Sequence, residues 1–263
     1  MSNLLVIPAR YDSSRFPGKP LALFEDFNGK KISLIEKTWQ LALNLNSFDK
    51  KIIATDDIRI KDFCEGFGAE VCMTSNDLRN GSERVAETLN LQDKSYKVIV
   101  NLQGDAPLTP IWVIEGLVKE LEKSNYEVAT PVLKCDQGTL NKLISDKKAG
   151  RIGATTVVFD KNQKALYFSK ELIPHINQKN LKNNLSSVYH HIGVYAYKSD
   201  ALKAYIKFPQ GNLEKQEGLE QLRFVENDIS IKCVISTLRG NEFWELNNPS
   251  DIPIIEKILK KND

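Results

Sequence analysis

Residues 4–21 read LLVIPARYDSSRFPGKPL, an apolar run that ends at a proline and continues into a loop rich in cations. Leu4–Pro8 is typical of a buried strand, because apolar side chains follow one another there without a charge. A helical pattern comes next at Ile32–Asn46, where apolar residues recur every three or four positions. This order predicts an α/β fold whose first loop lies at the carboxyl end of a strand.

The same alternation continues through the first half of the chain and predicts a Rossmann-like, mostly parallel sheet covered by helices. Expected strands are Lys51–Thr55, Glu70–Met73 and Val98–Leu102, and expected helices are Asp57–Gly66, Ser82–Asn90 and Trp112–Lys123. The second half has less regular helical patterns between its strands, which favours a smaller mixed or antiparallel insertion. Its expected elements are strands at Glu127–Leu133, Thr155–Asp160, Ala165–Ser169, Gly193–Tyr197 and Ile229–Ile235, an exposed loop at His175–Ser187 and a closing helix at Pro249–Lys261.

Composition excludes several classes of protein. The 36 basic and 34 acidic residues are spread along the 263-residue chain without basic blocks, so nucleic-acid binding is not expected. The 4 cysteines form no C-x-x-C pair and have no histidine at zinc-ligand spacing, which predicts reduced thiols in a cytosolic protein. No apolar run approaches membrane-spanning length, so we expect a cytoplasmic protein without integral membrane contact.

The loop after the first strand has the residue types that bind phosphate. Arg10 and Arg15 offer planar donor forks and Lys19 a compact charge, so the three could clamp a triphosphate. Two serines and Gly18 add donors and close backbone approach, although the Walker pattern is absent. A solvated basic loop is the alternative interpretation, and the three prolines argue against it because they preset the shape of the loop.

A second candidate site follows the apolar run at Val98–Leu102, where the chain continues as Gln-Gly-Asp-Ala-Pro. Asp105 is thereby expected at the carboxyl edge of a central strand. One carboxylate beside a phosphate loop suits Mg²⁺, which shares its ligand shell with substrate phosphates. An ordinary Gly-Asp-x-Pro turn explains the same pattern equally well.

Taken together, these segments resemble the 3-deoxy-manno-octulosonate (Kdo) cytidylyltransferases, also called CMP-Kdo synthetases, along nearly the whole chain. The matched segments are Ile7–Leu21, Ala54–Asp57, Gly81–Arg84, Asn101–Pro107, Ala165–Ser169, Ile173–Pro174, His191–Tyr197 and Leu219–Arg223. The resemblance implies a nucleotide-diphospho-sugar transferase fold, one domain over residues 1–263 with a dimerisation and sugar-binding subregion near 135–225, and a homodimer. It also implies Mg²⁺-dependent transfer of CMP from CTP to the anomeric hydroxyl of an ulosonic acid, with release of pyrophosphate, for lipopolysaccharide or capsule synthesis.

The resemblance also assigns roles to individual residues. The catalytic group would consist of Arg10, Arg15, Lys19 and Asp105, and further nucleotide contacts would come from Pro8, Ala9, Ser14, Ser82, Arg84 and Gln103. The sugar would be contacted by Gln103, His191, Tyr195, Glu220 and Gln221. The metal would be bound by Asp105 and Asn247. His191 has an alternative reading as a core histidine. Glu214, Glu217 and Glu220 are spaced by three, so they could equally form a solvated helix face.

Three departures from the family pattern bear on the metal and the sugar. Ala106 stands where the family carries glutamate, and Asn247 stands at a metal-ligand aspartate. An amide oxygen brings no charge, so metal affinity should fall unless Glu245 or a substrate carboxylate compensates. The segment Gly150–Ala154 stands where the family has an Asn/Pro-like segment near the sugar pocket. The substrate could therefore be a relative of Kdo, such as 8-amino-Kdo.

Two other hypotheses remain open at this point. Loss of metal ligands is also what a catalytically impaired paralogue would show, one that binds nucleotide or a protein partner. Within enzymes, a nucleotidyltransferase for another base or sugar shares the sheet and the basic loop. Turnover with CTP and a panel of ulosonic acids separates these readings.

Overall fold

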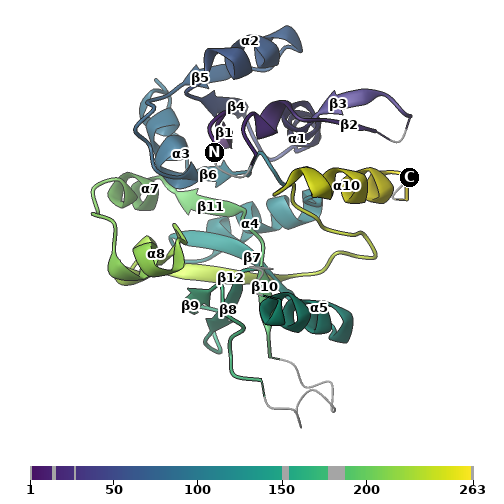
Figure 1. Cartoon of the computed structure of the whole chain (residues 1–263). Coiled ribbons are helices and arrows are strands. Elements are labelled where there is room, and N and C mark those ends of the chain that lie inside the picture. The colour runs from purple at the N-terminus through teal and green to yellow at the C-terminus, as the bar shows by residue number, and fades with distance from the viewer. Residues whose placement is uncertain (1, 14–15, 27, 150–153, 177–186, 262–263) are drawn as a thin grey trace. The chain divides into compact units, whose positions relative to one another are not determined.

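Figure 1 shows the computed structural model of the chain, which describes residues 2–13, 16–26, 28–149, 154–176 and 187–261. The chain divides into two compact units. The first consists of Met1–Val118 and Leu238–Asp263, and the second of Lys119–Thr237. No helix among the described residues is long and apolar enough to cross a membrane.

The first unit contains a parallel sheet in the order β5-β4-β1-β6. Its strands are β1 (Asn3–Ala9), β4 (Lys50–Thr55), β5 (Val71–Met73) and β6 (Val98–Asn101). The centre of β1 is fully buried, as expected for a strand between two others in a sheet covered by helices. Ala9 pairs with Thr55 in register, so neighbouring strands end at the same edge and place the loops that follow them together.

Helices α1 (Leu34–Leu43), α2 (Ile58–Gly66), α3 (Gly81–Asn90) and α4 (Ile111–Lys123) alternate with these strands, and the boundary between the units falls within α4. The predicted helix at Ile32–Asn46 was wrong at its start. Lys31–Ser33 forms strand β3, which pairs with β2 (Leu23–Glu25). Ser33 then caps α1, because its Oγ accepts a hydrogen bond from the Glu36 backbone nitrogen at 3.2 Å.

The end of the chain packs on this hairpin. A turn of 3₁₀-helix (Pro249–Asp251) leads into α10 (Ile252–Leu259), so the closing helix is shorter than predicted. Ile255 and Leu259 join a buried cluster with Phe24, Ile32 and Leu246. The segment just before the last helix is thereby anchored to the first unit.

The second unit is built around β7 (Val128–Lys134). One edge of β7 pairs with β12 (Ile231–Ser236) in parallel, and the other pairs antiparallel with β11 (Tyr195–Lys198) and β10 (Tyr189–His191). The sheet is extended by β8 (Thr156–Phe159), which pairs with β10, and by β9 (Ala165–Ser169), which pairs with β8. The helices of the second unit are α5 (Gln137–Lys148), α7 (Ser199–Tyr205), α8 (Asn212–Glu217) and α9 (Leu222–Glu226).

The predicted fold class is confirmed: a mostly parallel, helix-covered sheet is accompanied by mixed strand pairing in the second half. All four cysteines are free thiols, as predicted. Helices α5 and α7 were not predicted, and most of the loop expected at His175–Ser187 lies outside the described residues.

Candidate active site

The cation-rich loop after β1 is closed by backbone hydrogen bonds. Gly18 has a φ of 70° and donates its N–H to the Tyr11 carbonyl at 2.8 Å. A residue with a Cβ is strained at this φ, so glycine suits the turn. A short 3₁₀-helix, Lys19–Leu21, follows and fixes the backbone of Lys19. Ser14 and Arg15, both predicted to contact nucleotide, lie outside the described residues.

Lys19 reaches the second predicted site. Its Nζ lies 2.6 Å from Oδ2 of Asp105, and both side chains are largely buried. The phosphate-loop lysine and the strand-end carboxylate, 86 residues apart in sequence, are therefore brought together as expected from strands that end at one edge. Lysine and aspartate neutralise each other within this pair.

A third segment, just before the last helix, completes this cluster. Leu246 is fully buried, and its N–H donates to the Asp105 carbonyl at 3.0 Å. Glu245 and Asn247 flank it in the chain. Burial and the Asp105 charge raise the pKa of Glu245 to about 7, because two neighbouring carboxylates resist being ionised together.

The oxygen atoms gathered here fit a hard cation. Asp105 offers a carboxylate, and Glu245 and Asn247, which flank the anchored Leu246, offer a carboxylate and an amide, the ligand types that Mg²⁺ prefers. The described residues contain no group of three or more His, Cys, Asp or Glu side chains that could hold a metal. Ala106, buried beside Asp105, adds no polar group.

The predicted nucleotide residues Arg10 and Arg84 are held by different partners. Arg10 donates from Nη2 to the Leu78 carbonyl at 2.7 Å. Arg84 is fully buried, pairs with Asp56 at 2.6 Å and donates to Thr74. Burial lowers the pKa of Arg84, an effect that Asp56 opposes. Asp56 was matched to the family only as part of a segment, and its role as the counter-charge of a buried arginine was not predicted.

Two glycines allow close packing around Gln103, another predicted contact. A Cβ at Gly81 would lie 3.1 Å from Nε2 of Gln103, and a Cβ at Gly104 would lie 3.0 Å from the Pro8 carbonyl oxygen. Both distances are tighter than ordinary packing of side chains. Ser82, which follows Gly81 in the first turn of α3, and Ala9, which follows Pro8 at the end of β1, are both buried.

The predicted sugar residues other than Gln103 belong to the second unit. His191 is 5% exposed, its Nε2 lies 2.9 Å from Oγ1 of Thr130, and its ring contacts those of Phe168 and Tyr195. Burial, and to a lesser extent His190, lower the pKa of His191 to about 3, so the ring is neutral. Gln221 is 2% exposed, and its Nε2 has no hydrogen-bond partner among the described residues.

The hypothesis that three glutamates share a solvated helix face is wrong. Helix α8 ends at Glu217, because Gly218 adopts a left-handed conformation, so Glu220 lies beyond that helix. Glu214 is buried and forms a two-pronged ion pair with Arg223, with both distances 2.7 Å. Glu217 accepts hydrogen bonds from Tyr167, Ser169 and the Lys170 backbone. The buried Arg223 was not predicted.

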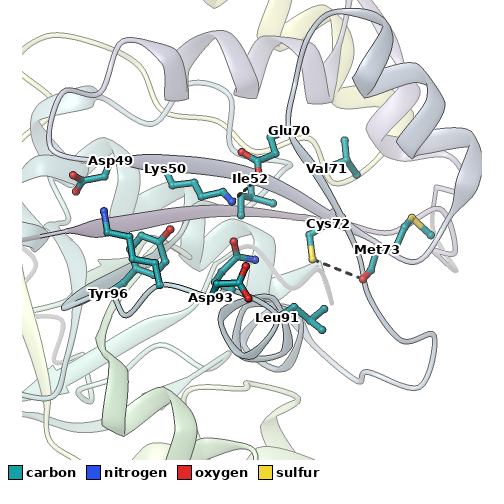
Figure 2. A pocket seen from close by; sticks show the side chains of 12 residues that line it. Asp49, Lys50, Ile52, Glu70, Val71, Cys72, Met73, Leu91, Asp93 and Tyr96 are labelled. Carbon is teal, nitrogen blue, oxygen red and sulfur yellow. Dashed lines mark hydrogen bonds and ion pairs between the residues drawn. The ribbon is translucent and has the colours of Figure 1, made fainter.

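A pocket of about 680 Å³ lies elsewhere in the first unit (Figure 2). Its lining includes Lys50 and Glu70, which form an ion pair at 2.6 Å, together with Cys72 and Tyr96. None of the predicted site residues lines this pocket. The site is therefore defined by the Lys19–Asp105 cluster rather than by this hollow.

The sequence model of the family described as cytidylyltransferase matches residues 4–231. The chain belongs to the cytidylyltransferase family. This cytidylyltransferase is 39% identical to the 3-deoxy-manno-octulosonate cytidylyltransferase of Maricaulis maris, over 98% of this chain and 97% of the relative. It is 40% identical to the 8-amino-3,8-dideoxy-manno-octulosonate cytidylyltransferase of Shewanella pealeana, over 98% and 99%. The resemblance drawn from the sequence motifs is confirmed.

Solved structures agree with this membership. The cytidylyltransferase superimposes on a CMP:2-keto-3-deoxy-manno-octonic acid synthetase complexed with CTP with a TM-score of 0.84 and 28% identity, and all of both chains is covered. A 4-diphosphocytidyl-2C-methyl-D-erythritol synthase from Anaerococcus prevotii gives a TM-score of 0.60 at 14% identity, over 98% of this chain and 96% of that one. That second likeness concerns the fold alone.

Proposed function

We propose that this cytidylyltransferase transfers CMP from CTP to the anomeric hydroxyl of a 3-deoxy-ulosonic acid and releases pyrophosphate. The observation that carries the proposal is the ion pair between Lys19 and Asp105, which joins a phosphate-type loop to a strand-end carboxylate. Full-length relatives named for this reaction on Kdo and on its 8-amino derivative support it.

The reaction is an in-line displacement. The sugar hydroxyl oxygen bonds to the α-phosphorus as the bond to the α–β bridging oxygen breaks, and that electron pair leaves with pyrophosphate. Arg10 and Lys19 hold the triphosphate and offset its charge, so their contribution is positioning and electrostatic stabilisation. Asp105 and the Asn247 amide would hold Mg²⁺, which would neutralise charge on the phosphates when bound.

The sugar is assigned to residues of the second unit. The unmet donor on the buried Gln221 supports this assignment, because a buried amide without a partner is costly unless a ligand accepts its hydrogen bond. The neutral, aromatic-lined His191 supplies at most one further hydrogen bond, since its Nε2 is already engaged by Thr130.

The deciding experiment is pyrophosphate release with CTP, Mg²⁺ and a panel of ulosonic acids that includes Kdo and 8-amino-Kdo. We expect turnover with at least one acid, and at least tenfold slower turnover with UTP or GTP. CTP binding without turnover of any acid would instead favour the impaired paralogue. The near-equal identity to relatives named for Kdo and for 8-amino-Kdo makes the 8-amino acid the second candidate.

The cellular setting is part of the same proposal and rests on the resemblance. We place the enzyme in the cytoplasm as a homodimer that supplies an activated sugar for lipopolysaccharide or capsule. Light scattering of the purified chain tests the dimer, and a mass of one chain at micromolar concentration would contradict it.

A further inference from the structure

Tyr11 closes the cation-rich loop with both its backbone and its ring. The Tyr11 carbonyl accepts the Gly18 N–H at 2.8 Å, and the nearest ring atoms would lie 3.3 Å from a Cβ at Gly18. Arg10 directly precedes Tyr11 in the chain, and Lys19 directly follows Gly18. The contact between Tyr11 and Gly18 therefore sets the spacing of two residues that are proposed to hold the triphosphate.

Arg59, in the first turn of α2, lies over the Tyr11 ring. The central carbon of its guanidinium is 3.3 Å from the ring centroid, well within the range of a cation–π contact. Arginine stacks on aromatic faces in this way because its guanidinium is planar and weakly hydrated. The Arg59 side chain is 56% exposed, so this contact can be removed without opening the core.

Asp57 holds the guanidinium in that place. Its Oδ1 accepts a hydrogen bond from Arg59 Nε at 2.9 Å and its Oδ2 accepts one from Nη2 at 2.5 Å, a two-pronged pair that fixes the orientation of the guanidinium. The same carboxylate caps α2, because Oδ1 also accepts the Arg59 backbone N–H at 2.9 Å. The Asp57 N–H donates to Oγ1 of the buried Thr55 at 3.2 Å, at the end of β4. The stack on Tyr11 is thereby tied to the sheet.

The pair of Asp57 and Arg59 differs from an ordinary surface ion pair. Exposed pairs contribute little to stability on their own. Asp57 balances the charge of Arg59, so the arginine adds little net charge to attract a phosphate. Its contact is instead with the ring that closes the loop. A loop held in its binding shape before the ligand arrives loses less conformational freedom on binding, which increases affinity.

We propose that Arg59 is a positioning residue for nucleotide binding in this cytidylyltransferase. Stacked on Tyr11, it keeps the cation-rich loop in the shape that presents Arg10 and Lys19 to the triphosphate of CTP. Arg59 acts through the tyrosine ring rather than by touching the nucleotide. This inference rests on the proposed function, because it takes CTP as the ligand of that loop.

The test measures CTP affinity of the full chain by isothermal titration calorimetry, with Mg²⁺ and without any ulosonic acid, so that no turnover occurs. We expect Arg59→Ala to weaken CTP binding about two- to fivefold, which corresponds to the free energy of an exposed cation–π contact. Tyr11→Phe keeps the ring face and should bind CTP like wild type. The matched control is Lys61→Ala, which removes a paired cation from the same helix and should leave CTP affinity unchanged.

A double-mutant cycle shows whether Arg59 acts through the ring. In a Tyr11→Leu background, Arg59→Ala should cause no further loss of CTP affinity, because the stack is already gone. Equal losses from Arg59→Ala in both backgrounds would mean that the guanidinium acts on the nucleotide directly, and would overturn the proposal. Unchanged affinity in Arg59→Ala, or a wild-type chain that binds no CTP, would overturn it too.

The outcomes separate this inference from the proposed function. A chain that binds CTP in an Arg59-dependent way but turns over no ulosonic acid would reject the function and keep the inference. A chain that turns over an acid, but whose Arg59→Ala variant binds CTP like wild type, would do the reverse. Where turnover is observed, Arg59→Ala should raise the KM for CTP and leave kcat unchanged, because a prearranged loop contributes equally to the ground state and the transition state.

Discussion

Acidification should unfold this protein partly through His191. The ring is buried against Phe168 and Tyr195, and Thr130 Oγ1 lies 2.8 Å from the Val194 carbonyl, to which it donates. The threonine oxygen therefore accepts from His191 Nε2, which makes the neutral ring with its proton on Nε2 the native form. A second proton would place an unpaired charge in the core, which is why the pKa falls from 6.5 to about 3.

The size of the effect follows from linkage. Below pH 6.5 the unfolded chain takes up a proton at this histidine while the folded chain does not, so stability falls with pH until the folded pKa is reached. The slope approaches about 1.4 kcal/mol per pH unit only well below pH 6.5, where the unfolded histidine is fully protonated, so the loss between pH 6.5 and pH 4.5 is about 2.3 kcal/mol. A glutamine in place of His191 keeps an N–H donor and cannot take up the proton.

Urea unfolding of wild type and His191→Gln at pH 7.0, 5.5 and 4.5 measures this contribution. Carboxylates titrate in both proteins, so the difference between the two pH profiles isolates the histidine. We expect the free energy of unfolding of the variant to fall less steeply, by roughly 2 kcal/mol over this range. Parallel profiles would refute the claim that the His191 ring is buried and neutral. His191 would then be a solvent-accessible residue of the sugar site.

Other perturbations test the packing of each unit. Gly104→Ala should raise the KM for CTP and cost about 1–3 kcal/mol of stability, because its Cβ meets the Pro8 carbonyl at 3.0 Å. Gly116→Ala, in α4 with nothing within 4 Å, is the control and should stabilise by up to about 1 kcal/mol with unchanged kinetics. In the second unit, Glu214→Gln should cost about 3–5 kcal/mol in urea unfolding, because Arg223 would be left buried without its counter-charge; a loss below 1 kcal/mol would mean that water reaches the guanidinium.

The first half of the chain could be predicted from sequence because its signals are local. Strands β1, β4 and β6 are short, largely buried apolar runs, and each is followed by a turn and then, further along the chain, by a helix. The meeting of Lys19 and Asp105 followed from the rule that parallel strands end at one edge. The start of α1 was missed because Lys31–Ser33 is too short to show an alternating pattern before the helix takes over.

The second half of the chain was harder to predict from sequence, because its stabilising contacts are long-range. Helix α5 (Gln137–Lys148) buries Leu140 and Leu143 and is otherwise polar, so its periodicity is weak. The glutamate spacing suggested an exposed face, yet Gly218 ends α8 and Glu214 turns inward to Arg223. A buried ion pair leaves no pattern in sequence, since each partner alone reads as a surface charge.

The metal site illustrates what a family resemblance carries over and what physics must add. Alignment transfers positions, so it places Asn247 where a carboxylate belongs and makes the site look weakened. Electrostatics requires only that enough negative oxygen lies beside Asp105, and a segment pinned by Leu246 and Asp251 can supply it from a neighbouring position.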